Sequence, residues 1–177
     1  MAAWISVYCE KSVGSLTPQK LLDAISVADF LTLAEWYEVP EENVQPAIAS
    51  LRIEPAREDG FDVYELHYRD PDERPVCIQR WAAPARVQEE IKEALEQLGE
   101  SRGAAVKDVR NHLGKVCEVI GIELGWSQVK GDMGVVFAYE VARCLAQSGH
   151  GYIGDLDGGW STVDKLGAFV HLLGSKQ

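Results

Sequence analysis

The stretch "VCEVIGIEL" (Val116–Leu124) decides the fold, because it is apolar enough to be a central strand of a sheet. A helix is expected soon after it, with Asp132 as N-cap and an end at about Gln147. Most positions of this helix are apolar or small, which predicts that it is largely buried. A buried strand followed by a buried helix places sheet and helix in the same core.

The glycines after this helix predict its end and a hairpin. Gly149-His150-Gly151 stops the helix, and Asp157-Gly158 favours a type I′ turn between strands at 152–155 and 160–163. The segment Gly149–Gly154 also matches the pattern GxGxxG. A dinucleotide loop needs a strand before it and a helix after it, and the order here is the reverse. We therefore interpret these glycines as a helix cap and a tight entry into a strand.

Outward from this region, strands and helices are interspersed without strict alternation. Strands are expected at 4–9, 61–68 and 76–82, and helices from Pro18, at 29–37, 41–51, 84–98 and 105–113. The apolar stripe expected on the helix 84–98 consists of Val87, Ile91, Leu95 and Leu98. The pattern predicts an α+β fold, a single domain over 1–177 with a mixed or antiparallel sheet packed by several helices. A weak lobe boundary is expected near 83–84.

The charge of the chain is concentrated in one segment. Residues 29–73 hold thirteen acidic residues against three arginines, a net charge of −10 out of −11 for the 177 residues. The same segment holds six aromatic residues, the type that anchors protein interfaces. Two interpretations stay open: a surface for a positively charged partner, or a solvated acidic face that aids solubility.

The first interpretation predicts a partner-binding surface. Its expected residues are Trp36, Tyr37, Glu38, Glu41, Glu42, Glu58, Asp59, Asp62, Asp70, Asp72 and Glu73. The proposal requires the helix end at 36–42 and the turn at 70–73 to converge on one side of the fold. If they lie on opposite sides, the solvated-face interpretation holds.

The composition also argues against several classes of function. A net charge of −11 without a basic cluster disfavours direct binding of nucleic acid or of anionic membrane. No metal-type spacing joins the four cysteines or the four histidines, and no catalytic motif appears, so we expect no metal, cofactor or catalytic residue. No segment has the basic and apolar pattern of a signal peptide, which predicts a cytoplasmic protein.

A cleft is the alternative site. Glu140 and Arg143 are three residues apart on a narrow polar arc of the expected helix, where they can pair, and Glu123 of the apolar strand could join them. This arrangement could serve an enzyme or a small-ligand-binding protein. A structural ion pair at the edge of the core explains the same residues.

The stretch Val116–Trp160 resembles small bacterial immunity proteins of contact-dependent and polymorphic toxin systems. In that family a strand, an "A-x-E-x-A-x-x-L-A" helix and a "G-x-I-x-D-x-D-G-x-W" hairpin follow one another. The matching residues are Ala138, Glu140, Ala142, Leu145, Ala146, Gly151, Ile153, Asp155, Asp157, Gly158 and Trp160. The resemblance covers about a quarter of the chain and transfers no functional residue.

The resemblance implies a non-enzymatic inhibitor that binds one toxin domain. Nuclease toxins have basic clefts, which clustered carboxylates with aromatic anchors could occlude. A third possibility is an adaptor that binds another basic protein. The sequence does not set the oligomeric state.

Overall fold

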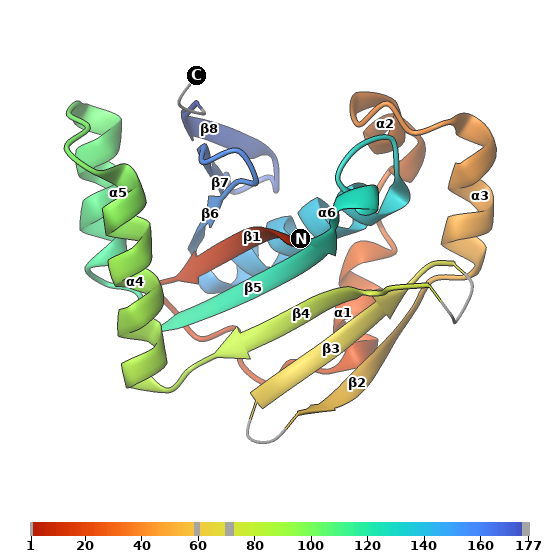
Figure 1. The fold of residues 1–177 in the computed structure, drawn as a ribbon, viewed down its shortest axis with the longest axis horizontal. Coiled ribbons are helices and arrows are strands. Elements are labelled where there is room, and N and C mark those ends of the chain that lie inside the picture. Colours follow the sequence, from red (N-terminus) through yellow and green to blue (C-terminus); the bar gives the residue numbers. More distant parts are fainter. Residues whose placement is uncertain (1, 59–60, 70–72, 175–177) are drawn as a thin grey trace. The chain divides into compact units, whose positions relative to one another are not determined.

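A computed structural model describes residues 2–58, 61–69 and 73–174, and within these ranges the side chains of Arg57, Glu58 and Phe61 are not described (Figure 1). The elements are, in order, β1 (Ala2–Cys9), α1 (Pro18–Ile25), α2 (Phe30–Trp36), α3 (Glu41–Ala49), β2 (Arg52–Glu58), β3 (Phe61–His67), β4 (Val76–Trp81), α4 (Pro84–Leu98), α5 (Ala104–Leu113), β5 (Glu118–Gly125), the 3₁₀ turn η1 (Trp126–Gln128), α6 (Met133–Gly149), β6 (Gly151–Gly154), β7 (Trp160–Val163) and β8 (Phe169–Leu173). The predicted α+β class is confirmed.

The strands form one sheet in the order β2-β3-β4-β5-β1-β6-β7-β8. The pairs β1–β6, β2–β3, β6–β7 and β7–β8 are antiparallel. The strand at Val116–Leu124 was predicted to be central, and β5 lies in the interior of this order, between β4 and β1. Its residues are buried along nearly the whole strand, as its apolar sequence requires.

Two strands were not predicted, and both lie at the ends of the sheet. β2 carries Pro55 and four charged residues, a composition that depletes strands but suits an edge. β8 is a five-residue run after the turn at Gly167. Both are held by their hairpin partners, β3 and β7, rather than by a strong pattern of their own.

The chain groups into two compact units, each made of several segments. The first unit contains residues 1–4, 15–79 and 122–141, and the second contains 5–14, 80–121 and 142–177. The acidic segment 29–73 lies entirely in the first unit.

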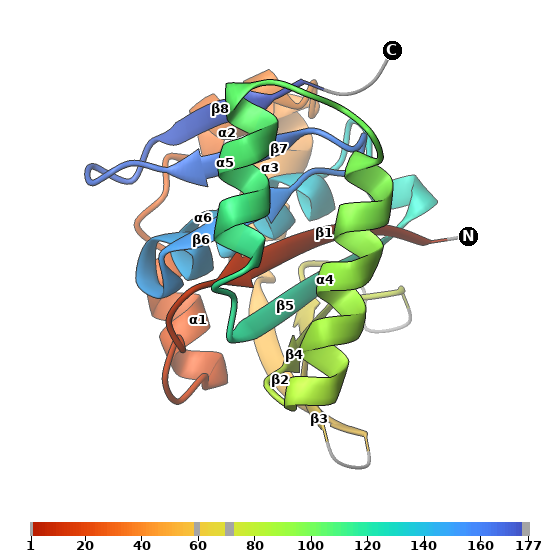
Figure 2. The same cartoon turned by 90° about the vertical axis from the view of Figure 1, so that its left-hand side faces the viewer.

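The second unit has a core in which α4 and α5, side by side in Figure 2, pack on strand residues that include Tyr8, Trp81, Val119 and Trp160. The stripe predicted for α4 is wrong at Leu95, which is 39% exposed. Ala94 and Glu90 are buried instead, since the spacing 87, 91, 94, 98 follows the 3.6-residue period more closely. Glu90 pairs with Arg86, and burial raises the pKa of its carboxyl.

The turn between β6 and β7 differs from the predicted type I′. That turn needs a positive φ at both central residues, whereas here only Gly158, at φ 83°, is left-handed. The amide of Gly158 donates to the carbonyl of Asp155 (3.0 Å), and the amide of Asp155 donates to the carbonyl of Gly159 (2.9 Å). The Asp157 carboxylate accepts a hydrogen bond from the amide of Gly159 (3.2 Å) and so stabilises this wider loop.

In the first unit three short helices follow β1, and the first two have side-chain N-caps. Thr17 caps α1 by accepting a hydrogen bond from the amide of Lys20 (3.2 Å), and Asp29 caps α2 by accepting one from Thr32 (3.3 Å). α1 lies against β2, and α2 lies against α3. The connection between α2 and α3 carries the residues singled out by composition.

Candidate functional site

The end of α2 has an unusual backbone. The amide of Val39 donates to the carbonyl of Ala34 (2.9 Å) and the amide of Glu38 donates to that of Glu35 (3.2 Å), which together make a Schellman motif. The residue after the C-cap in this motif is left-handed and is usually glycine. Here it is Glu38, at φ 56°. A carboxylate is therefore held at a position where a side chain costs conformational energy.

Exposed residues surround Glu38. Trp36, in the last turn of α2, is 70% exposed, the highest value of any tryptophan in the chain. Glu41 and Glu42 follow in the first turn of α3, where the helix dipole favours their negative charge. Both are exposed. We call residues 36–42 the α2–α3 corner.

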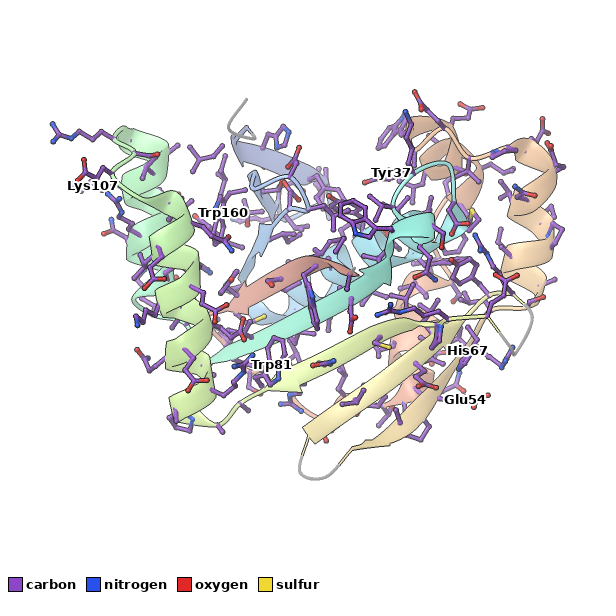
Figure 3. All side chains as sticks on the ribbon, in the orientation of Figure 1. Tyr37, Glu54, His67, Trp81, Lys107 and Trp160 are labelled. Carbon is purple, nitrogen blue, oxygen red and sulfur yellow. The ribbon has the colours of Figure 1, made fainter. Side chains whose placement is uncertain are left out.

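Tyr37 fixes the position of this corner. Its ring is half-buried and stacks on that of Tyr139 from α6, with 5.3 Å between the centroids and 19° between the planes. Figure 3 shows Tyr37 beside α2. Tyr37 therefore acts as a support, and Trp36 is the aromatic side chain available to a partner.

Residues 126–132 connect the corner with the turn after β3. The Lys130 ammonium lies 3.3 Å from the Glu38 carboxylate, and both side chains are mostly exposed. Asp132 pairs with Arg69, and Arg69 also donates to Glu73 (2.9 Å). A short series of contacts thus runs from Glu38 to Glu73 within the first unit. Asp70 and Asp72 lie outside the described residues.

This connecting segment adds a residue that composition did not reveal. Trp126 begins η1 directly after β5 and is 58% exposed. The available signal in the sequence is a tryptophan directly after the apolar strand and before the polar Ser127 and Gln128, where the chain is expected to leave the core. Trp126 belongs to the same segment as Lys130, whose contact with Glu38 no local pattern predicts.

A buried polar network holds this segment. The Tyr68 hydroxyl donates to the Asp132 carboxylate (2.5 Å) and accepts from the Gln128 amide (3.0 Å). Gln128 also donates to the carbonyl of Arg74 (2.9 Å) and accepts from the amide of Gly125 (2.7 Å). Burial raises the pKa of Tyr68, so this hydroxyl keeps its proton. The network satisfies each of these buried groups and fixes the loop that carries Trp126.

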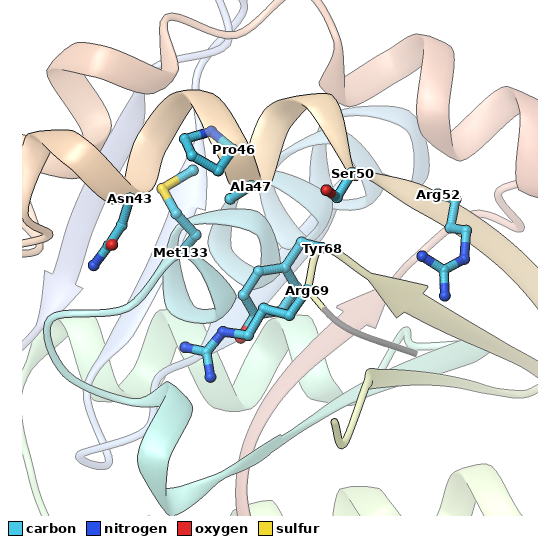
Figure 4. A pocket seen from close by; sticks show the side chains of 8 residues that line it. All are labelled: Asn43, Pro46, Ala47, Ser50, Arg52, Tyr68, Arg69 and Met133. Carbon is cyan, nitrogen blue, oxygen red and sulfur yellow. The ribbon is translucent and has the colours of Figure 1, made fainter. Parts of the chain in front are cut away.

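A hollow of about 640 Å³ lies between α3 and the Tyr68–Arg69 segment (Figure 4). Asn43, Pro46, Ala47, Ser50, Arg52, Tyr68, Arg69 and Met133 line it. In Figure 4 the Arg69 guanidinium lies on the Asn43 and Met133 side, and Arg52 lies at the other end. Arg69 is engaged by Asp132 and Glu73, and Arg52 pairs with Glu54 (3.1 Å). The two guanidiniums therefore do not converge on a common ligand position.

The remaining acidic residues lie elsewhere. Glu58 and Asp62 are near the turn end of the β2–β3 hairpin, Glu58 six residues from Arg52 along β2 and Asp62 five residues from His67 along β3. At about 3.3 Å per residue these separations are roughly 16–20 Å. Asp59 lies outside the described residues. The structure thus places Glu58 and Asp62 apart from the α2–α3 corner, which lies beyond the opposite end of β2.

The three residues of the alternative cleft are buried or engaged by other groups of the protein. Glu123 pairs with Arg74 at the end of β5. Glu140 is 2% exposed, and the Arg143 guanidinium donates to the carbonyl of Gly167 (3.2 Å). None of these three residues lines the hollow beside Tyr68 and Arg69, and none lines a second hollow between the α1–α2 connection and α3.

Two further observations bear on the class of protein. Within 2–58, 61–69 and 73–174, no helix is long and apolar enough to span a bilayer. Among these same described residues, no group of three or more His, Cys, Asp or Glu side chains is arranged to hold a metal ion.

Comparison with known proteins found no matching family model, no matching curated protein and no matching solved structure.

Proposed function

We propose that this protein is a cytoplasmic inhibitor that binds a basic protein partner, a toxin domain of nuclease type, through the α2–α3 corner. The observation that carries the proposal is the coincidence of two unfavourable features at one place. A tryptophan is 70% exposed, and two residues later a glutamate occupies a left-handed position that favours glycine. Features that lower stability concentrate where function requires them.

The charge of the corner supports this class of partner. Glu38, Glu41 and Glu42 are exposed, and Glu38 pairs with Lys130 (3.3 Å). Carboxylates beside an exposed indole match a lysine- or arginine-rich surface, which a nucleic-acid cleft must have. The indole supplies the apolar area that a binding hot spot needs, and it can also stack on a guanidinium.

Charge would also set the rate of capture. Electrostatic steering raises association from a neutral value of about 10⁵–10⁶ M⁻¹s⁻¹ toward about 10⁸–10⁹ M⁻¹s⁻¹ at low salt. An inhibitor of a lethal enzyme benefits from this speed. The toxin itself is suggested by the resemblance of Val116–Trp160 to immunity proteins, and an adaptor for another basic protein would use the same surface.

The test begins with the gene beside that of this chain, which should encode a basic toxin-like domain. It then measures rescue of cells that express this domain, and binding of the purified, inactivated domain. Replacing Glu38, Glu41 and Glu42 by lysine should abolish rescue and should lower the association rate constant for the toxin domain. The matched control reverses Glu89, Glu93 and Glu96, three exposed glutamates of α4. Equal binding and rescue by wild type and the corner variant would refute the proposal.

A further inference from the structure

A second feature of the first unit is a run of residues that contributes acidic side chains and no cation of its own. Residues 21–51 form the end of α1 together with α2 and α3, and they contain six acidic residues and no lysine, arginine or histidine. The acidic residues, all exposed, are Asp23, Asp29, Glu35, Glu38, Glu41 and Glu42. Cations that neutralise these residues must therefore come from other segments, as Lys130 does for Glu38, or from a partner.

An apolar hollow of about 510 Å³ opens among these residues, where α1 ends, α2 begins and α3 passes. Phe30 and Leu31 both line the hollow; Phe30 is 6% exposed and Leu31 is 49% exposed. The half-buried apolar residues around them are Leu22, Ala28, Ile48 and Leu51. The size falls within the range of ligand sites, about 300–1,000 Å³.

The polar residues that line this hollow are Ser26, Asp29 and Gln45, of which Asp29 carries a charge. Asp29 lies in it, and hydrogen bonds from Thr32, one from the hydroxyl at 2.8 Å, lower the pKa of its carboxyl. An apolar hollow with a carboxylate in its lining matches a segment that carries apolar side chains between cationic ones. A second copy of this run of residues does not match, because acid would meet acid.

We propose that this hollow receives the apolar face of a basic amphipathic helix of the partner protein. The inference rests on the proposed function, since it assigns a second contact to the same basic partner. The partner's leucine-sized side chains would cover Leu31 and the half-buried residues around it, and its lysines or arginines would pair with Asp23 and Asp29.

The probe is a synthetic 14-residue helix of leucine and lysine in a heptad pattern, titrated into the isotopically labelled full chain and followed by amide NMR shifts. The control peptide has serine in place of leucine at the same charge. We expect shifts at Leu22, Leu31 and Ile48 with the first peptide. Equal affinity for the serine peptide, or shifts confined to other residues, would overturn the inference.

Two matched variants separate the hollow from general charge effects. Leu31→Arg places a cation in the lining, whereas Val27→Arg makes the same change at an 81% exposed position outside it. Leu31→Arg should weaken peptide binding by about tenfold or more, the loss expected when a buried leucine contact is removed. Val27→Arg should change it by about threefold or less. Equal effects of the two variants would contradict a contact at the hollow.

The outcomes also separate this inference from the proposed function. If Trp36→Ala abolishes binding of the neighbour-encoded toxin domain while Leu31→Arg changes neither ligand's affinity, the hollow is not a contact and the proposed function stands. If Leu31→Arg weakens peptide binding while Trp36→Ala leaves toxin binding unchanged, the hollow is a contact and the proposed function is wrong.

Discussion

Replacing Glu38 by glycine should stabilise the fold and weaken partner binding. Glu38 has φ 56° at a position where the Schellman motif favours glycine. A left-handed L-residue costs about 1–2 kcal/mol, which glycine recovers. This gain is offset by about 0.5–1 kcal/mol, because glycine has more conformational freedom to lose from the unfolded chain. The pair with Lys130 is largely solvated and contributes little, about 0–0.5 kcal/mol. The net expectation is stabilisation by about 0.5 kcal/mol.

Urea unfolding measures this change. The midpoint should rise with an unchanged slope, since the variant alters one residue and not the surface exposed on unfolding. Glu38→Ala is the matched control: it removes the same carboxylate but keeps a side chain in the left-handed region, so it should not gain stability. His150→Gly, at the other left-handed non-glycine residue described, should gain stability without changing binding. A midpoint for Glu38→Gly at or below that of Glu38→Ala would refute the strain argument.

Three further predictions concern the scaffold. Tyr68→Phe removes a hydrogen bond to the buried carboxylate of Asp132 and should lower the free energy of unfolding by about 1.5–3 kcal/mol in urea titration. Gly149→Ala should destabilise by about 1–3 kcal/mol, because a Cβ would lie 2.6 Å from a buried sulfur, while Gly114→Ala, with ordinary contacts, should be neutral or slightly stabilising. Burial lowers the pKa of His112 below its ordinary value of 6.5, so the stability that depends on the neutral imidazole is complete above that pH and is lost as the pH falls below it. The difference in unfolding free energy between wild type and His112→Gln should therefore shrink from about pH 7.5 to about pH 5.5, and a constant difference would contradict this.

The fold class, β5 and the helices could be predicted because their signals are local. Periodicity, caps such as Thr17 and breakers such as Gly99 act within a few residues. β2 was missed because Pro55 and its charges oppose strand formation, and pairing with β3 overrides that preference. Leu95 was misplaced because it lies four residues after Ile91, an ordinary helical spacing, whereas the buried face continues through Ala94, three residues after Ile91.

The candidate site divides in the same way. Composition singled out Trp36 and the acidic residues around it, and their exposure follows from their place on short helices. The separation of Glu58 and Asp62 from this corner depends on the length of the β2–β3 hairpin. The link between the segment 126–132 and the corner depends on a contact between residues far apart in the chain, Lys130 with Glu38. Counting charges along the sequence gives no information about the hairpin length or about such long-range contacts.

The most direct test of the central claim is the dissociation constant of the neighbour-encoded, inactivated toxin domain for wild type and Trp36→Ala, measured at two salt concentrations. Trp36 is 70% exposed, so its removal should leave the unfolding free energy within about 0.5 kcal/mol of wild type. We predict that affinity falls by about 30-fold or more, the loss typical of a central tryptophan, and that wild-type binding weakens strongly with salt. Unchanged affinity for Trp36→Ala at both salt concentrations would contradict a binding surface at the α2–α3 corner.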